Sequence, residues 1–222
     1  RIHPELAGRP LDELLPAQSS PSLAIRHTVG LSDALTEDEV VDAPADGLPV
    51  SLEAVIARYG VTHFKIKTAG RLGDDIPRLH RILDLIDAAG IDPVLTIDGN
   101  ESMTTAQHLV EWTGGLLADE RLAPVLRDDL VAVEQPFHRS IALGAEAAEA
   151  LARLRGDVAV IIDESDDAVT TVREAMDLGY AGGPAAPPAL RRPPHARHPR
   201  LPPPPPTRRN STTPAEPAPT TI

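Results

Sequence analysis

The first feature of the sequence that indicates chemistry is its pair of lysines. Lys65 and Lys67 are the only lysines among 222 residues, and arginine is used everywhere else. On a strand, side chains two positions apart point to the same face, so the two ammonium groups would lie side by side. Two such cations lower each other's pKa, and a lysine near neutrality can act as a general base, which an arginine cannot. The alternative is a pair of solvated lysines on an edge strand.

Three acidic residues continue the pattern that the lysines begin. Asp98, Glu134 and Asp163 each follow an apolar stretch, and the intervals from Lys67 onward are 31, 36 and 29 residues. One βα unit takes about 30 residues. We therefore predict that all four side chains rise from the carboxyl ends of consecutive parallel strands, which is where parallel α/β folds place their chemistry.

Three carboxylates that converge on one point repel one another unless a cation lies between them. Mg²⁺ prefers oxygen ligands and keeps positions for water or substrate, so we expect Mg²⁺ as the cofactor. The alternative is that each acid caps the helix that follows its strand. We predict that three nearby residues either contact the ligands from outside or bind the ion in place of one of them: Asn100, Glu101 and Glu164. His27 is predicted either to reach the site or to be a structural histidine.

Apolar periodicity and turn residues divide the body of the chain into alternating strands and helices. Asp74 or Asp75 is expected to cap a helix that ends at Gly90, and Trp112 is expected inside another helix. Strands are predicted at 22–31, 63–67, 91–98, 129–136 and 157–165, and helices at 51–60, 74–90, 103–127, 141–156 and 167–178. Repeating βα units with apolar strands predict an α/β protein with a parallel sheet covered by helices.

The composition excludes several classes of protein. The sequence has no cysteine, so disulfides and thiolate metal sites are excluded. Its net charge of −12 argues against nucleic acid as a partner. No apolar run has the length of a membrane span, and no signal peptide is visible. We therefore expect no membrane partner and a cytoplasmic location.

Four short motifs, taken in order, resemble those of the enolase superfamily. They are KIK at 65–67, DGNE at 98–101, VEQP at 133–136 and DES at 163–165. The resemblance is to the branch of mandelate racemase and muconate lactonizing enzyme, and it extends over roughly residues 22–182. Each motif alone is weak, whereas the ordered set is specific.

The resemblance implies a (β/α) barrel of the TIM type, of which residues 21–183 would supply roughly the first five to six βα units. It implies that Asp98, Glu134 and Asp163 hold Mg²⁺. It also implies that Lys67 removes the proton α to the carboxylate of a small-molecule substrate, while Lys65 tunes Lys67. This step would give an enediolate that the metal stabilises. The reaction would be a racemisation, an epimerisation, a cycloisomerisation or a dehydration. Members of this family are often oligomeric.

The two ends depart from the family pattern. Residues 1–20 are too short for the capping domain that normally precedes the barrel, so we expect a linker or a remnant of that domain. From Pro184 to Ile222, 14 of 39 residues are proline, with six arginines against one glutamate. Such a segment is expected to be disordered, and its abrupt composition suggests a shifted reading frame. The alternative is a genuine tail in which RLPPPPP (200–206) binds a proline-recognising domain.

These departures affect the expected activity. No lysine follows Lys67, so the second base of the family is not found in the sequence. We therefore expect a partial barrel that keeps the metal and base residues but has little or no turnover. The alternatives are a non-catalytic fragment and a protein that interacts through its proline-rich tail.

Overall fold

Five parallel strands in sequential order form the sheet of the protein. The computed structural model describes residues 7–13, 15–18 and 21–183. Its strands are β1 (Arg26–Val29), β2 (His63–Lys67), β3 (Val94–Asp98), β4 (Leu130–Glu134) and β5 (Val160–Ile161). They lie in the order β1-β2-β3-β4-β5, and each neighbouring pair is parallel. The structure thus confirms the predicted strand at 63–67 with the same bounds.

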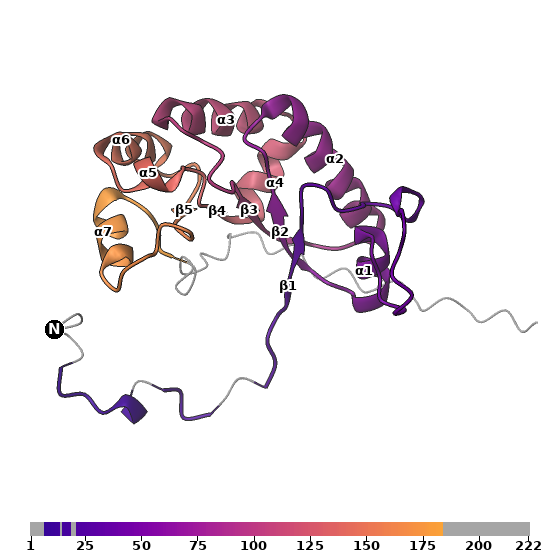
Figure 1. Cartoon of the computed structure of the whole chain (residues 1–222), viewed down its shortest axis with the longest axis horizontal. Coiled ribbons are helices and arrows are strands. Elements are labelled where there is room, and N and C mark those ends of the chain that lie inside the picture. The colour runs from indigo at the N-terminus through magenta and orange to yellow at the C-terminus, as the bar shows by residue number, and fades with distance from the viewer. Residues whose placement is uncertain (1–6, 14, 19–20, 184–222) are drawn as a thin grey trace, which may run out of the picture.

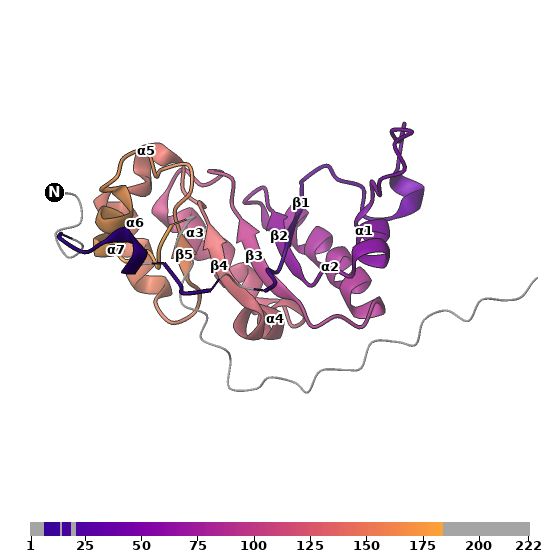
Figure 2. The same cartoon turned by 90° about the horizontal axis from the view of Figure 1, so that it is seen from below.

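Helices connect the strands and cover one face of the sheet. They are α1 (Leu52–Tyr59), α2 (Leu72–Ala88), α3 (Ala106–Ala118), α4 (Leu122–Asp128), α5 (Arg139–Ala142), α6 (Ala145–Leu154) and α7 (Thr171–Leu178), with short 3-10 turns η2 (Leu11–Glu13) and η3 (Glu37–Glu39). Figure 1 shows α2, α3 and α6 in an arc along one side of the strands. Figure 2 shows the sheet running from α1 and α2 at one end to α6 and α7 at the other. A parallel sheet with sequential neighbours and helical crossovers is a partial (β/α) barrel, which confirms the predicted fold class.

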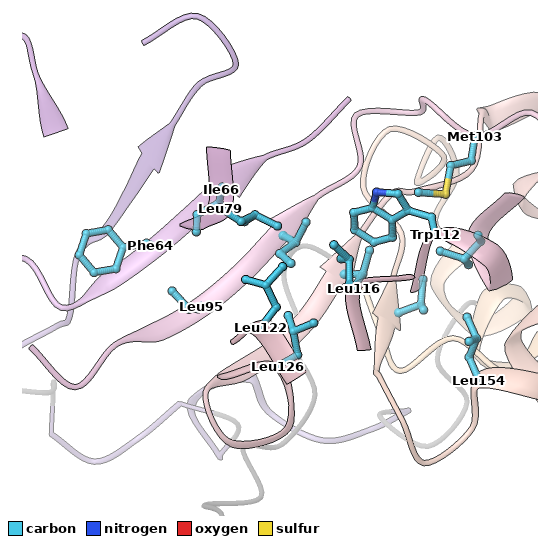
Figure 3. Close-up of a cluster of buried hydrophobic side chains, with 14 of the residues drawn as sticks. Phe64, Ile66, Leu79, Leu95, Met103, Trp112, Leu116, Leu122, Leu126 and Leu154 are labelled. Atoms are coloured by element: carbon cyan, nitrogen blue, oxygen red, sulfur yellow. The ribbon is translucent and has the colours of Figure 1, made fainter. Parts of the chain in front are cut away.

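The two faces of the sheet differ in chemistry because side chains alternate along each strand. The face toward the helices is apolar, and Phe64, Ile66 and Ile97 are almost fully buried there. Trp112 and Leu116 of α3 belong to the same core cluster (Figure 3). Burial of this apolar surface is the main stabilising contribution to the fold. The opposite face carries the polar residues of the same strands.

The start of α2 differs from the prediction. The helix begins two residues earlier than expected, and neither Asp74 nor Asp75 is its N-cap, which is Arg71. The buried Asp75 carboxylate instead accepts hydrogen bonds from the backbone N–H groups of Ala69 and Arg71, at 2.8 Å each, and from Trp112 Nε1 at 2.9 Å. This acid therefore fixes the loop after β2 from inside the first turn of the helix.

Three further elements are shorter or divided. The helix predicted at 141–156 is two helices, α5 and α6, because Gly144 has an extended ψ of 167° between them. β5 is confined to two residues of the predicted 157–165. β1 begins only at Arg26, and the preceding Leu23 and Ile25 are exposed to solvent. Among the described strands β1 pairs only with β2, so nothing on its other side extends it.

Some predictions fall outside the described residues. These are the disorder and binding role of 184–222 and, within the linker or capping-domain remnant expected at 1–20, residues 1–6, 14 and 19–20. The domain boundaries therefore stay predictions. Within the described part of the chain, no helix is both long and apolar enough to cross a membrane.

Two glycines make a matched test of this packing. A Cβ on Gly99, directly after β3, would lie 2.6 Å from the backbone Cα of Pro136, whereas a Cβ on Gly114 in α3 would meet nothing within 4 Å. We expect Gly99→Ala to lower the free energy of unfolding by about 1 to 3 kcal/mol, because backbone must move. Gly114→Ala should raise it by up to about 1 kcal/mol, because alanine favours the helix. Urea unfolding followed by the fluorescence of Trp112, the only tryptophan, measures both. Equal midpoints for the two variants would contradict the close approach at Gly99.

Candidate functional site

The last residues of three neighbouring strands lie side by side on the polar face of the sheet. Lys67 of β2 pairs with Asp98 of β3, and Asp98 pairs with Glu134 of β4. Lys65 lies on the same face, one layer below Lys67. Asp163 follows β5 and contacts the same cluster. The structure therefore brings together the four residues that the spacing of the sequence placed at one edge, with Lys65 beside them.

Lys65 is the centre of this cluster. Its Nζ lies 3.0 Å from Asp98 Oδ2, 3.0 Å from Glu134 Oε1 and 3.9 Å from Asp163 Oδ2. The Lys65 side chain is only 14% exposed, and the side chains of Asp98 and Glu134 are 2% and 3% exposed. One ammonium thus contacts carboxylates from three different strand ends.

Lys67 has a more open environment than Lys65. Its side chain is 31% exposed, and its Nζ lies 3.4 Å from Asp98 Oδ2. Its shortest contact is a hydrogen bond of 2.7 Å that it donates to Asn100 Oδ1. The predicted neighbour Asn100 is therefore part of the site, through Lys67. Asn100 also donates its backbone N–H to Asp98 Oδ1 at 2.9 Å, and its φ of 53° is left-handed.

The charges of the cluster shift each other's protonation. Burial raises the pKa of Glu134, and its hydrogen bond with Lys65 offsets only part of that rise. Burial by itself would lower the pKa of Lys65, but the hydrogen bonds with Glu134 and Asp98 outweigh it, and the pKa is raised. The expectation that the lysine pair lowers both pKa values is therefore wrong for Lys65, because its nearest charges are carboxylates.

Arg26 of β1 reaches the site, and His27 does not. Arg26 Nη1 donates to Thr96 Oγ1 at 3.0 Å and lies 3.6 Å from Glu134 Oε2. His27 pairs with Phe64 in the register of β1 and β2, which places it on the opposite, helix-facing side. There it lines an apolar groove of about 700 Å³, and burial lowers its pKa. Of the two predictions for His27, a place in the site is therefore wrong, and the structural role is the one that agrees with this register.

The other predicted acids have separate environments. Glu101 accepts two side-chain hydrogen bonds from Arg139, at 2.8 and 2.7 Å, so it joins two loops and stays out of the carboxylate cluster. Glu164 has a buried Oε2 without a hydrogen-bond partner among the described atoms. The ion pairs of Lys65 in the described part of the chain are with Asp98, Glu134 and Asp163, so the roles of Glu101 and Glu164 as alternative ligands stay predictions.

Gln135 is a residue of the site that the sequence analysis missed. It is 1% exposed, and its backbone has a left-handed φ of 36°. Its Oε1 accepts from the backbone N–H groups of Asp163, at 2.8 Å, and of Ser165, at 3.2 Å. Its Nε2 donates to the carbonyl of Phe137 and to Ser165 Oγ, both at 2.8 Å. Gln135 therefore positions Asp163 against the end of β4. The only signal in the sequence is an amide inside the VEQP motif.

The donor set fits a hard divalent cation. The three predicted ligands Asp98, Glu134 and Asp163 are all carboxylates, which suits Mg²⁺. Glu134 Oε2 is a buried acceptor that lacks a hydrogen bond, and a cation would satisfy it. As the side chains lie, however, no group of three or more His, Asp or Glu residues in the described ranges is arranged to hold a metal ion. The Lys65 ammonium lies at the point on which the carboxylates converge.

A substitution at Gln135 tests its positioning role. Gln135→Met keeps the length of the side chain but leaves the backbone N–H groups of Asp163 and Ser165 without an acceptor. We expect the free energy of unfolding to fall by about 2 to 4 kcal/mol. Gln107→Met, at an exposed position of α3, is the control and should change it by less than about 0.5 kcal/mol. Urea unfolding measures both, and equal values would show that the loop does not depend on Gln135.

Comparison with known proteins supports this fold. No protein-family model and no curated protein matches the sequence. An N-succinyl Arg/Lys racemase from Bacillus cereus matches in structure with a TM-score of 0.50 and 17% identity, over 77% of this chain and 39% of that one. An enolase from Bradyrhizobium, solved with magnesium and mandelic acid, matches with a TM-score of 0.51 and 24% identity, over 79% of this chain and 41% of that one.

The chain spans about two fifths of the length of these two enzymes. At these identities the match concerns the fold. A mandelate racemase/muconate lactonizing protein from Herpetosiphon aurantiacus gives a weaker match, with a TM-score of 0.35 and 21% identity over 59% of this chain and 42% of that one. The chain thus shares its fold with part of the racemase from Bacillus cereus and of the enolase from Bradyrhizobium.

Proposed function

We propose that the strand-end cluster is the site of an Mg²⁺-dependent enzyme of the enolase superfamily that removes the proton α to a carboxylate. The observation that carries the proposal is the convergence of Asp98, Glu134 and Asp163 with the only two lysines of the chain. Neighbours of the same fold include a racemase and an enzyme solved with magnesium and mandelic acid.

In the proposed mechanism, Asp98, Glu134 and Asp163 would hold Mg²⁺. When bound, the ion supplies positive charge that stabilises the negative charge developing on the substrate carboxylate. Lys67 is the general base, since it lies at the open rim of the sheet and is more exposed than Lys65. It takes the proton from the α-carbon, while the electron pair of the C–H bond delocalises into the carboxylate.

Neighbouring groups orient Lys67 for this step. The Asn100 amide oxygen, 2.7 Å away, fixes the direction of the Nζ. Lys65, deeper in the site, provides an ammonium that a substrate carboxylate can share. The substrate class that we propose is therefore a small carboxylate with an activated α-hydrogen, such as an α-hydroxy acid or an N-acyl amino acid. A racemisation, epimerisation, cycloisomerisation or dehydration would each begin with this proton transfer.

A second candidate is a chain that binds the metal ion without turnover. It corresponds to the expectation from the sequence, in which the chain keeps the metal and base residues with little or no turnover. A role for 184–222 in recruiting a proline-binding partner and a cytoplasmic location also remain proposals from the sequence.

Metal binding gives the first test. We expect the full chain to bind Mg²⁺, and we expect Asp98→Asn and Glu134→Gln each to weaken binding by about tenfold or more, because each removes a buried anionic ligand. Glu111→Gln, on the exposed side of α3, makes the same chemical change away from the site and should leave the affinity unchanged. Isothermal titration calorimetry measures all four proteins. Equal affinities in the wild type and Asp98→Asn would remove the metal site from the strand ends.

Proton exchange tests the base. If Lys67 acts as the base of the proposed enzyme, α-deuterium enters at least one member of a panel of α-hydroxy and N-acyl amino carboxylates in D₂O with Mg²⁺, as followed by ¹H NMR. Lys67→Ala should abolish the exchange, because no other group takes the proton, whereas Arg71→Ala, at an exposed position of the neighbouring loop, should retain it. Mg²⁺ binding without any exchange would favour the second candidate, which agrees with the inactivity expected from the sequence.

A further inference from the structure

We infer that Lys65 is a built-in cation that occupies the metal position while the protein is free of metal, and that a divalent ion must displace it in order to bind. The inference rests on the proposed metal ligands, and it adds that the Lys65 ammonium competes with the metal ion for them. Its basis is the pair of equal contacts of Lys65 Nζ, 3.0 Å to Asp98 Oδ2 and 3.0 Å to Glu134 Oε1, with Asp163 at 3.9 Å.

The cluster needs a cation whether or not a metal is present. The Asp98 and Glu134 side chains are at least 97% buried, and two buried carboxylates without a counter-ion are strongly destabilising. Lys65 is the residue that meets this need, because it contacts three acids, while Lys67 contacts one. Lys65 is itself 86% buried, so its ammonium is held inside the cluster and is not free in solvent.

The ammonium and a divalent ion cannot share this place. Mg²⁺ binds carboxylate oxygens at about 2.1 Å. An ion between Asp98 Oδ2 and Glu134 Oε1 would therefore lie close to the present position of Lys65 Nζ, where repulsion between the two cations is strong in a site shielded from water. Glu134 Oε2, buried and without a hydrogen bond, is a further oxygen that the ion can take and that Lys65 leaves unused.

Lys67 is held differently and can stay where it is. Its contact with Asp98 is longer, at 3.4 Å, and its strongest bond is to the neutral Asn100 amide, at 2.7 Å. Displacement of Lys65 would free its ammonium on the face that Lys67 also occupies. Binding of the metal ion would then make the Lys65 ammonium available to a substrate carboxylate. The ion would therefore bind before the substrate.

Calorimetry of three full-length proteins with Mg²⁺ tests the displacement. We expect Lys65→Met to bind Mg²⁺ about tenfold more tightly than the wild type, because the ion no longer competes with the ammonium. Lys67→Met removes the same charge two residues away and is expected to change the affinity by less than about threefold. Equal or weaker binding by Lys65→Met would overturn the inference while leaving the metal site in place. Equal gains in both variants would also overturn it, because they would reflect net charge alone.

Thermal melting separates this inference from the proposed function. Without metal, Lys65→Met should melt about 5 °C or more below the wild type. Saturating Mg²⁺ should then raise the melting temperature of Lys65→Met by more than it raises that of the wild type. If neither protein binds Mg²⁺, both the metal site and the displacement are wrong. An unchanged melting temperature in the metal-free variant would also overturn the counter-ion role of Lys65.

The wild-type protein gives a readout that does not depend on a variant's folding. Since the chain has two lysines, selective ¹³C labelling of lysine gives two side-chain signal sets, which the spectrum of Lys67→Met assigns. We expect the Lys65 signals to move on addition of Mg²⁺ in step with the calorimetric binding curve, and to move more than those of Lys67. Lys65 signals that stay in place at saturating Mg²⁺ would show that the ammonium is not displaced.

Discussion

The hydrogen-bonded register of β2, β3 and β4 is the constraint on which the site depends. It places the last residues of the three strands in one row, Lys67 beside Asp98 beside Glu134. A shift of any strand by one residue would move its charged group into the apolar face and expose its core residues. The packing of Phe64 and Ile97 against the helices therefore holds the charged groups in place as well as stabilising the fold.

Buried charge at the strand ends has to be balanced from within the sheet. Asp98 and Glu134 are almost fully shielded from water, and their desolvation is unfavourable unless cations and hydrogen bonds compensate. Lys65 from β2 supplies most of that compensation, and Arg26 from β1 faces the other oxygen of Glu134. Polar side chains then fix the loops: Asp75 holds the segment after β2, and Gln135 holds the segment after β5.

Much of this arrangement is predictable from sequence, because it follows from local periodicity and from the length of a βα unit. Three features are of this kind: the bounds of β2, the helix around Trp112, and the common edge of Lys67, Asp98, Glu134 and Asp163.

Features that depend on contacts between distant segments were missed. The face of β1 depends on where this outer strand begins. The sequence left His27 open between the site and a structural role, and the contribution of Arg26 was not predicted. The protonation of Lys65 was misjudged because its neighbour in sequence is a lysine, whereas its neighbours in space are acids from other strands. Gln135 acts through residues 28 to 30 positions away, and no local pattern shows such bonds.

The hydrogen bond between Trp112 and Asp75 links the core of the protein to the rim of the site. The indole donates to a carboxylate that also binds the backbone of Ala69 and Arg71, only a few residues after Lys67. Any rearrangement of that loop has to strain or reorient this bond, which changes the polarity around the indole ring. The lone tryptophan is thereby an intrinsic optical probe of the loop, and its emission can report a ligand at the strand ends while the protein remains fully folded.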